Sequence, residues 1–370
     1  MIRVLSVFGT RPEAVKMAPV VKALTNRPDR FESIVCVTAQ HREMLDRAVA
    51  VFGLTVDHDL DVMRPDQTPA DTAAAVLARL PALIRAVRPT VLLVQGDTTT
   101  TFAAAFCAFL EHVPAGHVEA GLRTGNFEQP FPEEMNRVLA TRLAALHFAP
   151  TEAAQANLRA EGVNAADIFV TGNTVIDALL QTVRPDHRFL DPRLNSLRAE
   201  ARLVLVTTHR RENFGEPLAN ICAALRELAR KFPELEFVLP VHPNPNVRGT
   251  IEAQLGSLPA FRLVDPLDYV DLVQLLNRAY LVLTDSGGIQ EEAPSLGKPV
   301  LVLREVTERP EGVTAGTALL VGTDTSRIVA AASTLLTDAD AYARMARAVN
   351  PYGDGRAAER IADILERRFS

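Results

Sequence analysis

Short runs of continuous apolar residues constrain this chain more than any other feature. The first is Ile2–Phe8, and the others are Ser33–Thr38, Thr90–Val94, Ala115–Val118, Ile168–Thr171, Leu203–Thr207, Glu236–Val241, Phe261–Val264, Tyr280–Thr284, Pro299–Leu303 and Ala318–Val321. Strands that are buried on both faces of a parallel sheet have this pattern, whereas strands with one solvated face alternate. Amphipathic stretches such as Glu13–Leu24 and Pro217–Lys231 lie between the runs. The alternation occurs twice, which predicts two doubly wound, Rossmann-like α/β domains.

A polar segment over residues 184–202 separates the two expected domains. It contains two prolines and is typical of a linker with one short helix. We therefore expect an N-terminal domain over residues 1–183 and a C-terminal domain over 203–354, in line with about 150 residues per domain. The charged segment 355–370 is expected to be helical, and its pattern does not say which domain it packs on.

Composition excludes several classes of protein. The chain has 39 Lys and Arg against 45 Asp and Glu, which gives a net charge of −6. It therefore lacks the basic excess that is typical of nucleic-acid-binding proteins. Cys36, Cys107 and Cys222 are scattered and predict reduced core thiols rather than disulfides or a zinc cluster. No apolar run approaches the roughly 18 residues of a membrane span, and the apolar N-terminus is too short for a signal peptide. We expect a cytoplasmic protein that does not engage a membrane.

Polar residues gather where the predicted strands end. They follow five strands, as the segments Gly9–Glu13, Gln95–Thr101, Glu119–Arg123, Thr208–Asn213 and Asp285–Gly288. Ligands of open α/β sheets bind beyond the carboxyl ends of the strands. Two such domains therefore predict one central cleft that both of them line.

The segment Asp285-Ser286-Gly287-Gly288 is the clearest local unit. Two glycines that open a helix allow close approach of a ligand, and the free N–H groups of the helix start form an anion site. Glu292, about one turn further, is placed to accept from a ribose hydroxyl. The alternative is an ordinary strand-to-helix turn in which Asp285 or Ser286 is the N-cap.

Cationic side chains occur at two further strand ends. Arg11 and Lys16 begin the helix after the first strand and are suited to hold a diphosphate, unless they are merely solvated helix charges. His209 lies among four ionisable residues, which favours a place in the cleft over one in the core.

Three carboxylates, Asp97, Glu119 and Glu133, form a set suited to proton transfer, because like charges in one dry site separate the pKa values of acid and base. Asp97 has the alternative role of N-cap. Glu119 ends a buried strand and needs a partner, for which Arg123 is a candidate. Glu133 and Arg137 are four residues apart, a spacing that is otherwise typical of a surface ion pair.

The chain lacks a Gly-x-Gly-x-x-Gly segment after its first strand, so tightly bound NAD is not expected. Its motifs instead resemble those of the non-hydrolysing UDP-N-acetylglucosamine 2-epimerases. The matching segments are FGTRPEAVKMAP (8–19), VTAQHREML (37–45), QGDTTTT (95–101), GHVEAGLRTG (116–125), PFPEEMNR (130–137), VTGNTVIDAL (170–179), THRRENFGEP (208–217), PVHPNPNVR (240–248), residues 284–317 and NPYGDGRA (350–357).

This resemblance implies a glycosyltransferase-B-like pair of domains, of which 203–354 binds the nucleotide and 355–370 crosses back to the first. It implies reversible conversion of UDP-GlcNAc to UDP-ManNAc without NAD or a required metal, by a homodimer. The nucleotide and diphosphate would be held by Arg11, His209, Ser286, Gly287, Gly288, Glu292 and Arg309. The sugar would face Lys16, Asp97, Glu119, Glu133 and Arg137.

The resemblance also implies that Gln40, His41 and His242 match contacts of a second, activating substrate molecule in some members. Glu43 and Asp66 depart from the Gln and Arg that activated members tend to carry. Leu272 replaces an aromatic residue that can line the uracil pocket.

Three other functions fit the same scaffold. A hydrolysing 2-epimerase would release UDP and free ManNAc. A retaining glycosyltransferase would need an acceptor groove and fewer carboxylates on the sugar side. A silent nucleotide-sugar sensor would not need the acids and cations that this chain has.

Overall fold

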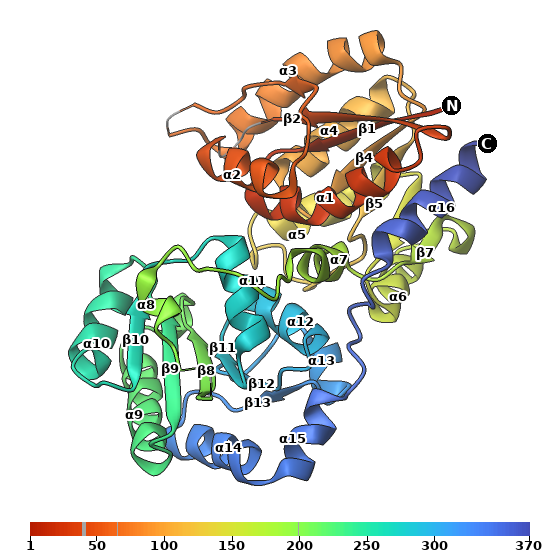
Figure 1. Cartoon of the computed structure of the whole chain (residues 1–370). Coiled ribbons are helices and arrows are strands. Elements are labelled where there is room, and N and C mark those ends of the chain that lie inside the picture. Colours follow the sequence, from red (N-terminus) through yellow and green to blue (C-terminus); the bar gives the residue numbers. More distant parts are fainter. Residues whose placement is uncertain (39–41, 65, 199) are drawn as a thin grey trace. The chain divides into compact units, whose positions relative to one another are not determined.

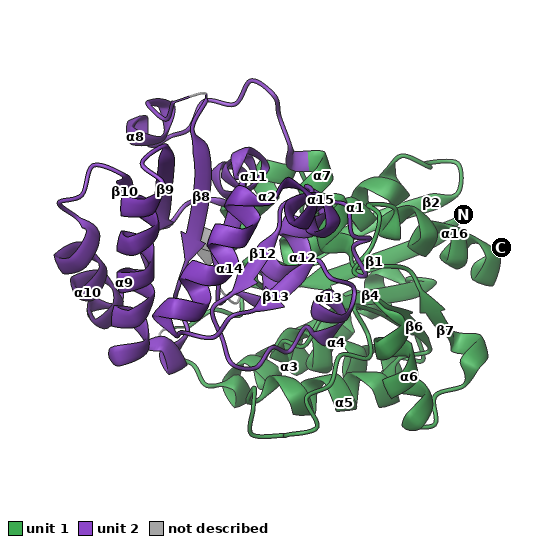
Figure 2. Ribbon diagram, turned by 90° about the horizontal axis from the view of Figure 1, so that it is seen from below, with its two compact units in different colours: residues 1–181, 352–370 green, residues 182–351 purple. Residues whose placement is uncertain are grey.

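The computed structural model describes residues 1–38, 42–64, 66–198 and 200–370. The chain divides into two compact units, residues 1–181 with 352–370 and residues 182–351 (Figure 2). Each contains a parallel sheet with helices between the strands, which confirms the predicted α/β class. The domain limits drawn from composition stay a prediction, and the segment 184–202 lies within the second unit. Among the described helices, none is long and apolar enough to cross a membrane.

Unit 1 is built on a seven-stranded sheet in the order β3-β2-β1-β4-β5-β6-β7 (Figure 1). Its strands are β1 (Ile2–Phe8), β2 (Phe31–Val37), β3 (His58–Asp59), β4 (Val91–Gln95), β5 (Ala115–Val118), β6 (Leu146–Ala149) and β7 (Ile168–Val170). Its helices are α1 (Arg11–Thr25), α2 (Arg42–Phe52), α3 (Pro69–Val87), α4 (Thr99–Leu110), α5 (Glu133–Leu143), α6 (Glu152–Ala160), α7 (Thr174–Thr182) and α16 (Ala357–Phe369).

Unit 2 is built on a six-stranded sheet in the order β10-β9-β8-β11-β12-β13. Its strands are β8 (Arg202–Thr207), β9 (Leu235–Pro240), β10 (Phe261–Val264), β11 (Leu281–Thr284), β12 (Val300–Val302) and β13 (Ala318–Leu320). Its helices are α8 (Pro192–Asn195), α9 (Glu216–Lys231), α10 (Pro245–Leu255), α11 (Tyr269–Arg278), α12 (Gly287–Ser295), α13 (Pro310–Thr314), α14 (Thr325–Thr337) and α15 (Ala339–Ala346).

Strand β8 shows why the apolar runs are continuous. Val204 and Val206 pack into a core cluster with residues of α9 and α14 on one face of the sheet. Leu203 and Leu205 pack into a second cluster with residues of α11 and α12 on the other face. Because helices cover both faces, every side chain of the strand interior must be apolar.

Each sheet has its own topological switch point. In unit 1, β1 pairs with β2 on one side and β4 on the other, and in unit 2, β8 pairs with β9 and β11 in the same manner. The chain order reverses at these pairs, which opens a crevice at the carboxyl ends of the strands. The polar segments after β1, β4, β8 and β11 therefore lie at the places where α/β sheets bind ligands.

Two strands were missed from the sequence. β6 is four residues long and contains His147, so it lacks a continuous apolar run, yet all four residues are buried. β3 is a two-residue edge strand within the acidic stretch at 57–61, where paired backbone groups rather than side chains define the element.

The C-terminal helix α16 belongs to unit 1, where it packs on α1 (Figure 1). The buried carboxylate of Asp177 accepts hydrogen bonds from the backbone N–H groups of Ala357 (3.2 Å) and Ala358 (2.8 Å). A side chain of α7 thereby satisfies the first turn of a helix that lies 180 residues further along the chain. Burial raises the pKa of Asp177, and the two N–H groups act against that rise.

We expect Asp177→Ala to lower the free energy of unfolding by about 1–2 kcal/mol, as the loss of a helix cap does, and to make α16 sensitive to proteolysis. Urea unfolding and limited proteolysis measure both effects. Asp363→Ala on α16 is the control, because it removes an exposed ion pair with Arg27 that contributes roughly 0–1 kcal/mol. An equal effect of the two substitutions would contradict the role given to Asp177.

Candidate active site

Glu13 joins the two loops at the switch point of unit 1. Its carboxylate is 1% exposed and accepts from the N–H groups of Gly9 (3.0 Å) and Thr10 (2.7 Å) and from the Thr98 hydroxyl (2.7 Å). Burial raises its pKa, and these donors counteract part of that rise. The first turns of α1 and α4 are thus fixed to each other, which sets the positions of the candidate residues that follow them.

Glu119 is the buried centre of the unit 1 site, and its side chain is 4% exposed. Its two carboxylate oxygens accept from Lys16 Nζ at 2.7 and 2.6 Å. Asn173 Nδ2 donates to Oε1 at 3.0 Å, and Gln95 Nε2 donates to Oε2. The partner that the sequence left open is therefore Lys16. The alternative of a solvated helix charge does not hold for this lysine.

Arg123 is engaged elsewhere. Its guanidinium forms two hydrogen bonds to Glu161, from Nε at 2.6 Å and Nη2 at 3.0 Å. It is therefore not the partner of Glu119, because the chain turns away from the strand end before it reaches residue 123.

Asp97 is paired with Arg137 rather than used as a helix cap. Arg137 donates from Nη2 (2.6 Å) and Nε (3.0 Å) to Asp97 Oδ2, and Thr98 is the N-cap of α4. Arg137 also donates to Glu134 at 3.0 Å. Burial alone would lower the pKa of Arg137, but these carboxylates raise it overall, so the guanidinium stays protonated.

Glu133 does not form the surface ion pair that its spacing from Arg137 allowed. Instead its Oε2 atom is buried, and it has no hydrogen-bond partner in the described part of the chain. Arg11, the first residue of α1, is half-buried, and its side chain forms no hydrogen bond or ion pair with any described residue. A buried acceptor and an unpaired cation at one sheet edge are the features expected of residues that meet a ligand.

His117 supports the turn that carries Asp97. Its Nε2 atom donates to the carbonyl oxygen of Gly96 at 2.7 Å. Its neighbour across the sheet is His147, and Nδ1 of both rings is buried without a partner among the described residues. Burial lowers the pKa of each histidine to about 4, so both are neutral at pH 7.

Asp285 anchors the unit 2 site, contrary to its alternative role as an N-cap. It is fully buried and accepts from the N–H groups of His209 (2.9 Å) and Arg210 (2.9 Å) and from Asn213 Nδ2 (3.0 Å). His209 Nδ1 lies 3.0 Å from its Oδ1 atom. Burial alone would raise the pKa of Asp285, but the hydrogen bonds from His209 and Arg210 lower it overall. An ionised aspartate therefore holds the half-exposed imidazole of His209 through Nδ1.

The start of α12 is flanked by two cations. Ser286 is the N-cap residue, and Gly287 begins the helix. A Cβ atom built at Gly287 would lie 3.9 Å from Arg210 Nη2 and 4.0 Å from Arg309 Cζ. Arg309 is itself oriented by a hydrogen bond from its Nε atom to Glu291. The helix N–H groups and both guanidinium groups therefore converge on one position, where an anion would be stabilised.

Glu292 lies in the same helix and is nearly buried. The Tyr269 hydroxyl donates to its Oε1 atom at 3.0 Å, and its Oε2 atom lies on the side of Gly288, 3.9 Å from a Cβ atom built there. Burial, with the neighbouring carboxylate, raises the pKa of Tyr269 well above its usual value, so its hydroxyl stays a donor. One oxygen of Glu292 is thus held by Tyr269.

The residues of the expected activating site are placed only in part. His242 is exposed and stacks on His209 with ring centroids 6.4 Å apart. Gln40 and His41 lie outside the described residues. Within the described ranges, no group of three or more His, Cys, Asp and Glu residues could hold a metal ion.

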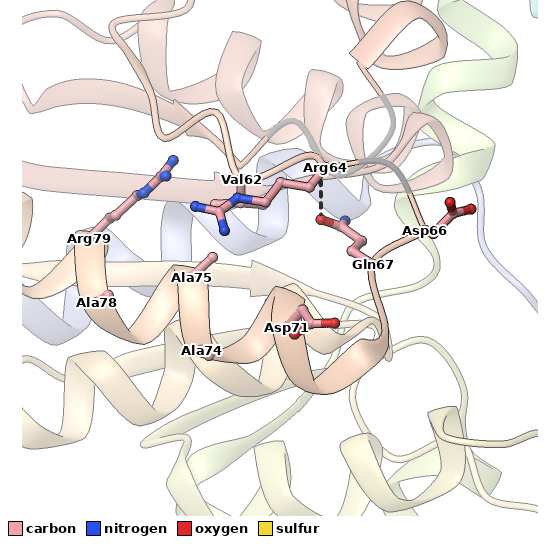
Figure 3. A pocket seen from close by; sticks show the side chains of 9 residues that line it. All are labelled: Val62, Arg64, Asp66, Gln67, Asp71, Ala74, Ala75, Ala78 and Arg79. Carbon is pink, nitrogen blue, oxygen red and sulfur yellow. Dashed lines mark hydrogen bonds between the residues drawn. The ribbon is translucent and has the colours of Figure 1, made fainter.

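Unit 1 also has a pocket of about 420 Å³ between α3 and the loop before it (Figure 3). Its polar groups are largely used within the protein: the Arg64 N–H donates to Gln67 (2.9 Å), and Arg79 donates to the carbonyl oxygens of Leu60 and Asp61. Asp71 caps α3 together with Thr68. None of the predicted acids or cations of the site lines this pocket.

Sequence reasoning missed four residues of the two sites. Gln95 and Asn173 lie within motifs that were recognised, but a neutral amide in a sequence does not by itself indicate a functional role. Tyr269 begins a helix distant in sequence from Glu292, and Arg210 was counted only as one of several charges. A search for donors near each buried carboxylate would have found them, but it requires tertiary structure.

The comparison with known proteins agrees with this architecture. A family model described as UDP-N-acetylglucosamine 2-epimerase matches residues 22–366. The UDP-N-acetylglucosamine 2-epimerase of Yersinia pestis is 54% identical over 372 residues, covering 99% of this chain and 98% of that protein. The protein of the same name from Escherichia coli K12 is 50% identical over 378 residues, covering 99% and 98%.

Solved structures extend the likeness to the fold. The UDP-GlcNAc 2-epimerase from Neisseria meningitidis, solved bound to UDP-GlcNAc, has a TM-score of 0.86 at 44% identity and covers 99% of this chain and 100% of its own. The glycotransferase of kitacinnamycin is 15% identical, has a TM-score of 0.67 over 100% of this chain and 99% of its own, and shares the fold alone.

Two Rossmann-like units with acids and cations at their switch points give this chain the α/β fold of the solved UDP-GlcNAc 2-epimerases. The chain belongs to the UDP-N-acetylglucosamine 2-epimerase family. Its homologues of that name are isomerases, so the chain is an enzyme of this kind.

We expect the stability of unit 1 to fall as pH decreases from about 6.5 to 4. The folded-state pKa of His117 and His147 is about 4, below the unfolded value, so the unfolded chain binds more protons in this window. The contribution of the neutral histidines to the free energy of unfolding is fully present above about pH 6.5. Below that pH it declines by roughly 1.4 kcal/mol per pH unit for each histidine.

Denaturant unfolding from pH 4.5 to 7 measures this slope. His117→Gln keeps a donor for Gly96 but does not titrate, so it should remove about half of the slope. His112→Gln changes an exposed histidine and should leave the slope as it is. A His117→Gln protein with the full slope would contradict the assignment.

Proposed function

We propose that this protein reversibly epimerises UDP-N-acetylglucosamine at carbon 2, giving UDP-N-acetylmannosamine, by elimination and re-addition of UDP without NAD or a required metal. The observation that carries the proposal is the buried carboxylate of Glu119 at a ligand-binding sheet edge, 2.6 Å from Lys16. Family membership supplies the substrate class. The alternatives, a hydrolysing epimerase and a retaining glycosyltransferase, differ in the fate of UDP.

The chemistry explains why this reaction needs acids and cations together. The hydrogen on carbon 2 is not next to a carbonyl group, so its direct removal as a proton would leave an unstabilised carbanion. When the C1–O bond breaks as the proton leaves, the C–H electron pair forms a C1–C2 double bond, and the C–O pair departs with UDP. Re-addition of UDP to C1, with a proton delivered to the opposite face of C2, completes the inversion.

Unit 2 supplies the groups suited to the nucleotide. The N–H groups of Gly287 and Gly288, with Arg309 and His209, would stabilise the negative charge that develops on the departing diphosphate. Ser286 precedes this helix start, and Glu292, oriented by Tyr269, would accept from the ribose. These groups are held in place before any ligand binds, so little reorganisation accompanies the reaction.

Unit 1 supplies the groups suited to the sugar. Asp97, Glu119 and Glu133 are the candidate proton-transfer groups, and Lys16 and Arg137 compensate the charges of Glu119 and Asp97. Arg11, whose side chain has no partner among the described residues, would bind the diphosphate from this side. The homodimer, the cytoplasmic location and the activating role of Gln40, His41 and His242 remain predictions of the resemblance.

Incubation of the purified protein with UDP-GlcNAc in deuterated water tests the reaction. We expect deuterium at carbon 2 of both UDP-sugars, because the proton exchanges with solvent through the carboxylate. Mass spectrometry and proton NMR measure it. Glu119→Gln, which keeps the shape but removes the base, should slow the exchange by at least about 100-fold.

The same incubation separates the alternatives. Free UDP that accumulates in proportion to turnover, with free ManNAc, would identify a hydrolysing enzyme. UDP released only after a sugar acceptor is added would identify a transferase. Recovery of unlabelled UDP-GlcNAc alone would overturn the proposed function.

We expect Tyr269→Phe to weaken UDP binding about fivefold, because Glu292 loses the donor that orients it toward the ribose. Calorimetry with UDP and 2′-deoxy-UDP measures the affinity and the preference for ribose, which should fall together. Tyr342→Phe is the control, since that hydroxyl donates to the backbone oxygen of Tyr280. Unchanged discrimination between the two nucleotides in Tyr269→Phe would refute this role.

A further inference from the structure

We propose that Gln95 and Asn173 are positioning residues that keep Glu119 ionised, so that Glu119, of the three candidate carboxylates, is the one that takes the proton from carbon 2. This inference rests on the proposed function. It rests on a difference in hydrogen bonding: Glu119 accepts from two buried amides, whereas no such amide donor is found for the other two candidate carboxylates among the described residues.

Glu119 receives neutral donors from the interior of unit 1. Asn173 donates to one oxygen and Gln95 to the other, and both amide side chains belong to residues that are 2% exposed. Hydrogen bonds to a carboxylate favour its charged form. Lys16 of α1 is a charged group that meets Glu119, and the ring of His117, on the strand before it, is neutral at pH 7.

The amide of Asn173 has a fixed orientation. Its Oδ1 atom accepts from the N–H of Val175 at 3.1 Å, so its Nδ2 atom must face Glu119. Its backbone N–H donates to the carbonyl oxygen of Tyr352 at 2.7 Å, which ties this loop to the returning C-terminal segment. A side chain held at both ends has little freedom to turn away from the carboxylate.

Gln95 is anchored through its backbone. It is the last residue of β4, and its carbonyl oxygen accepts from the Thr101 hydroxyl at 2.6 Å. Lys16 differs from both amides, because its side chain is 21% exposed and its stem is flexible. The lysine can therefore follow an anionic substrate, whereas the amides stay with Glu119.

Within the described ranges, the other two carboxylates receive no such interior donors. Asp97 is held by Arg137 at its side chain, which is 30% exposed. The buried Oε2 atom of Glu133 has no hydrogen-bond partner among the described residues. Glu119 is thus the member of the set whose charge is held by buried neutral donors as well as by a cation.

A carboxylate that is stabilised by several donors is a weak base. It suits an elimination in which C1–O cleavage runs ahead of proton loss, because positive charge at C1 acidifies the hydrogen on C2. Glu119 then gains that proton, the C–H pair becomes the C1–C2 double bond, and the C1–O pair leaves on UDP. Electrons and protons balance without a further reactant.

Asn173→Asp tests the role of the amide with minimal change of shape. The new side chain keeps the oxygen that caps Val175 but replaces the donor by a second carboxylate at hydrogen-bond distance from Glu119. Two carboxylates in contact share one proton, so the acidic limb of the kcat profile should move to higher pH. We expect kcat at pH 7 to fall at least about 100-fold while KM changes less than about threefold. Gln95→Glu should shift the acidic limb and lower kcat in the same way.

The matched control is Asn164→Asp. Asn164 also accepts from a backbone N–H two residues on, that of Ala166 at 3.1 Å, but it is exposed and does not contact Glu119. It should leave kcat and its pH profile unchanged. Melting temperatures of all variants show whether each is folded, and Asn173→Ser, which retains a capping oxygen but lacks the amide donor, should move the acidic limb in the same direction by a smaller amount.

Carbon-13 NMR of labelled glutamate carboxyl groups, with the Glu119 signal assigned through Glu119→Gln, measures protonation without turnover. We expect Glu119 to protonate at higher pH in Asn173→Asp than in the wild type. A folded Asn173→Asp protein with unchanged carboxyl titration and kcat profile would overturn the inference. Absence of carbon 2 exchange in the wild type would instead overturn the proposed function, while the NMR comparison would still decide the role of the amides.

Discussion

A carboxylate that is buried beside the end of a parallel strand must be surrounded by donors, and this requirement organises both units. Glu13, Glu119 and Asp285 are each nearly or fully buried, and each stands at or next to a switch point of its sheet. The cost of removing such a charge from water is several kcal/mol unless hydrogen bonds replace the solvent. Each carboxylate consequently gathers backbone and side-chain donors from segments far apart in the chain, and fixes those segments to one another.

The three carboxylates use their donors for different ends. Glu13 accepts hydrogen bonds from the loops after β1 and β4, and its role is structural. Asp285 collects the backbone of residues 209 and 210 and thereby orients an imidazole that is half exposed. Glu119 is held by two buried amides and by Lys16, whose side chain is 21% exposed. The same physical demand yields a scaffold, an oriented imidazole and a buried carboxylate paired with a lysine.

Much of the fold could be predicted from the sequence, because its evidence is local. The strands Ile2–Phe8, Ala115–Val118 and Phe261–Val264 were predicted with their observed limits, since strands covered on both faces consist mostly of apolar residues. Strand β6 was not predicted because His147 interrupts its short apolar run, although burial keeps that histidine neutral. The strand-end positions of Asp97, Glu119 and His209 were equally readable, whereas Gln95, Asn173 and Tyr269 were not, because an amide or a phenol signals a role only beside its acceptor.

The sequence by itself determined the succession of elements, the two sheets and the segments that follow their strands, since each depends on the burial of neighbouring residues in the chain. Tertiary structure alone decided the pairings. Arg137 is four residues from Glu133 but binds Asp97, and Arg123 is four residues from Glu119 but binds Glu161. Spacing fixes which side chains share a face of a helix or follow a strand. The partner of a charge depends instead on which loops the sheet order brings together, and that information is distributed over the whole unit.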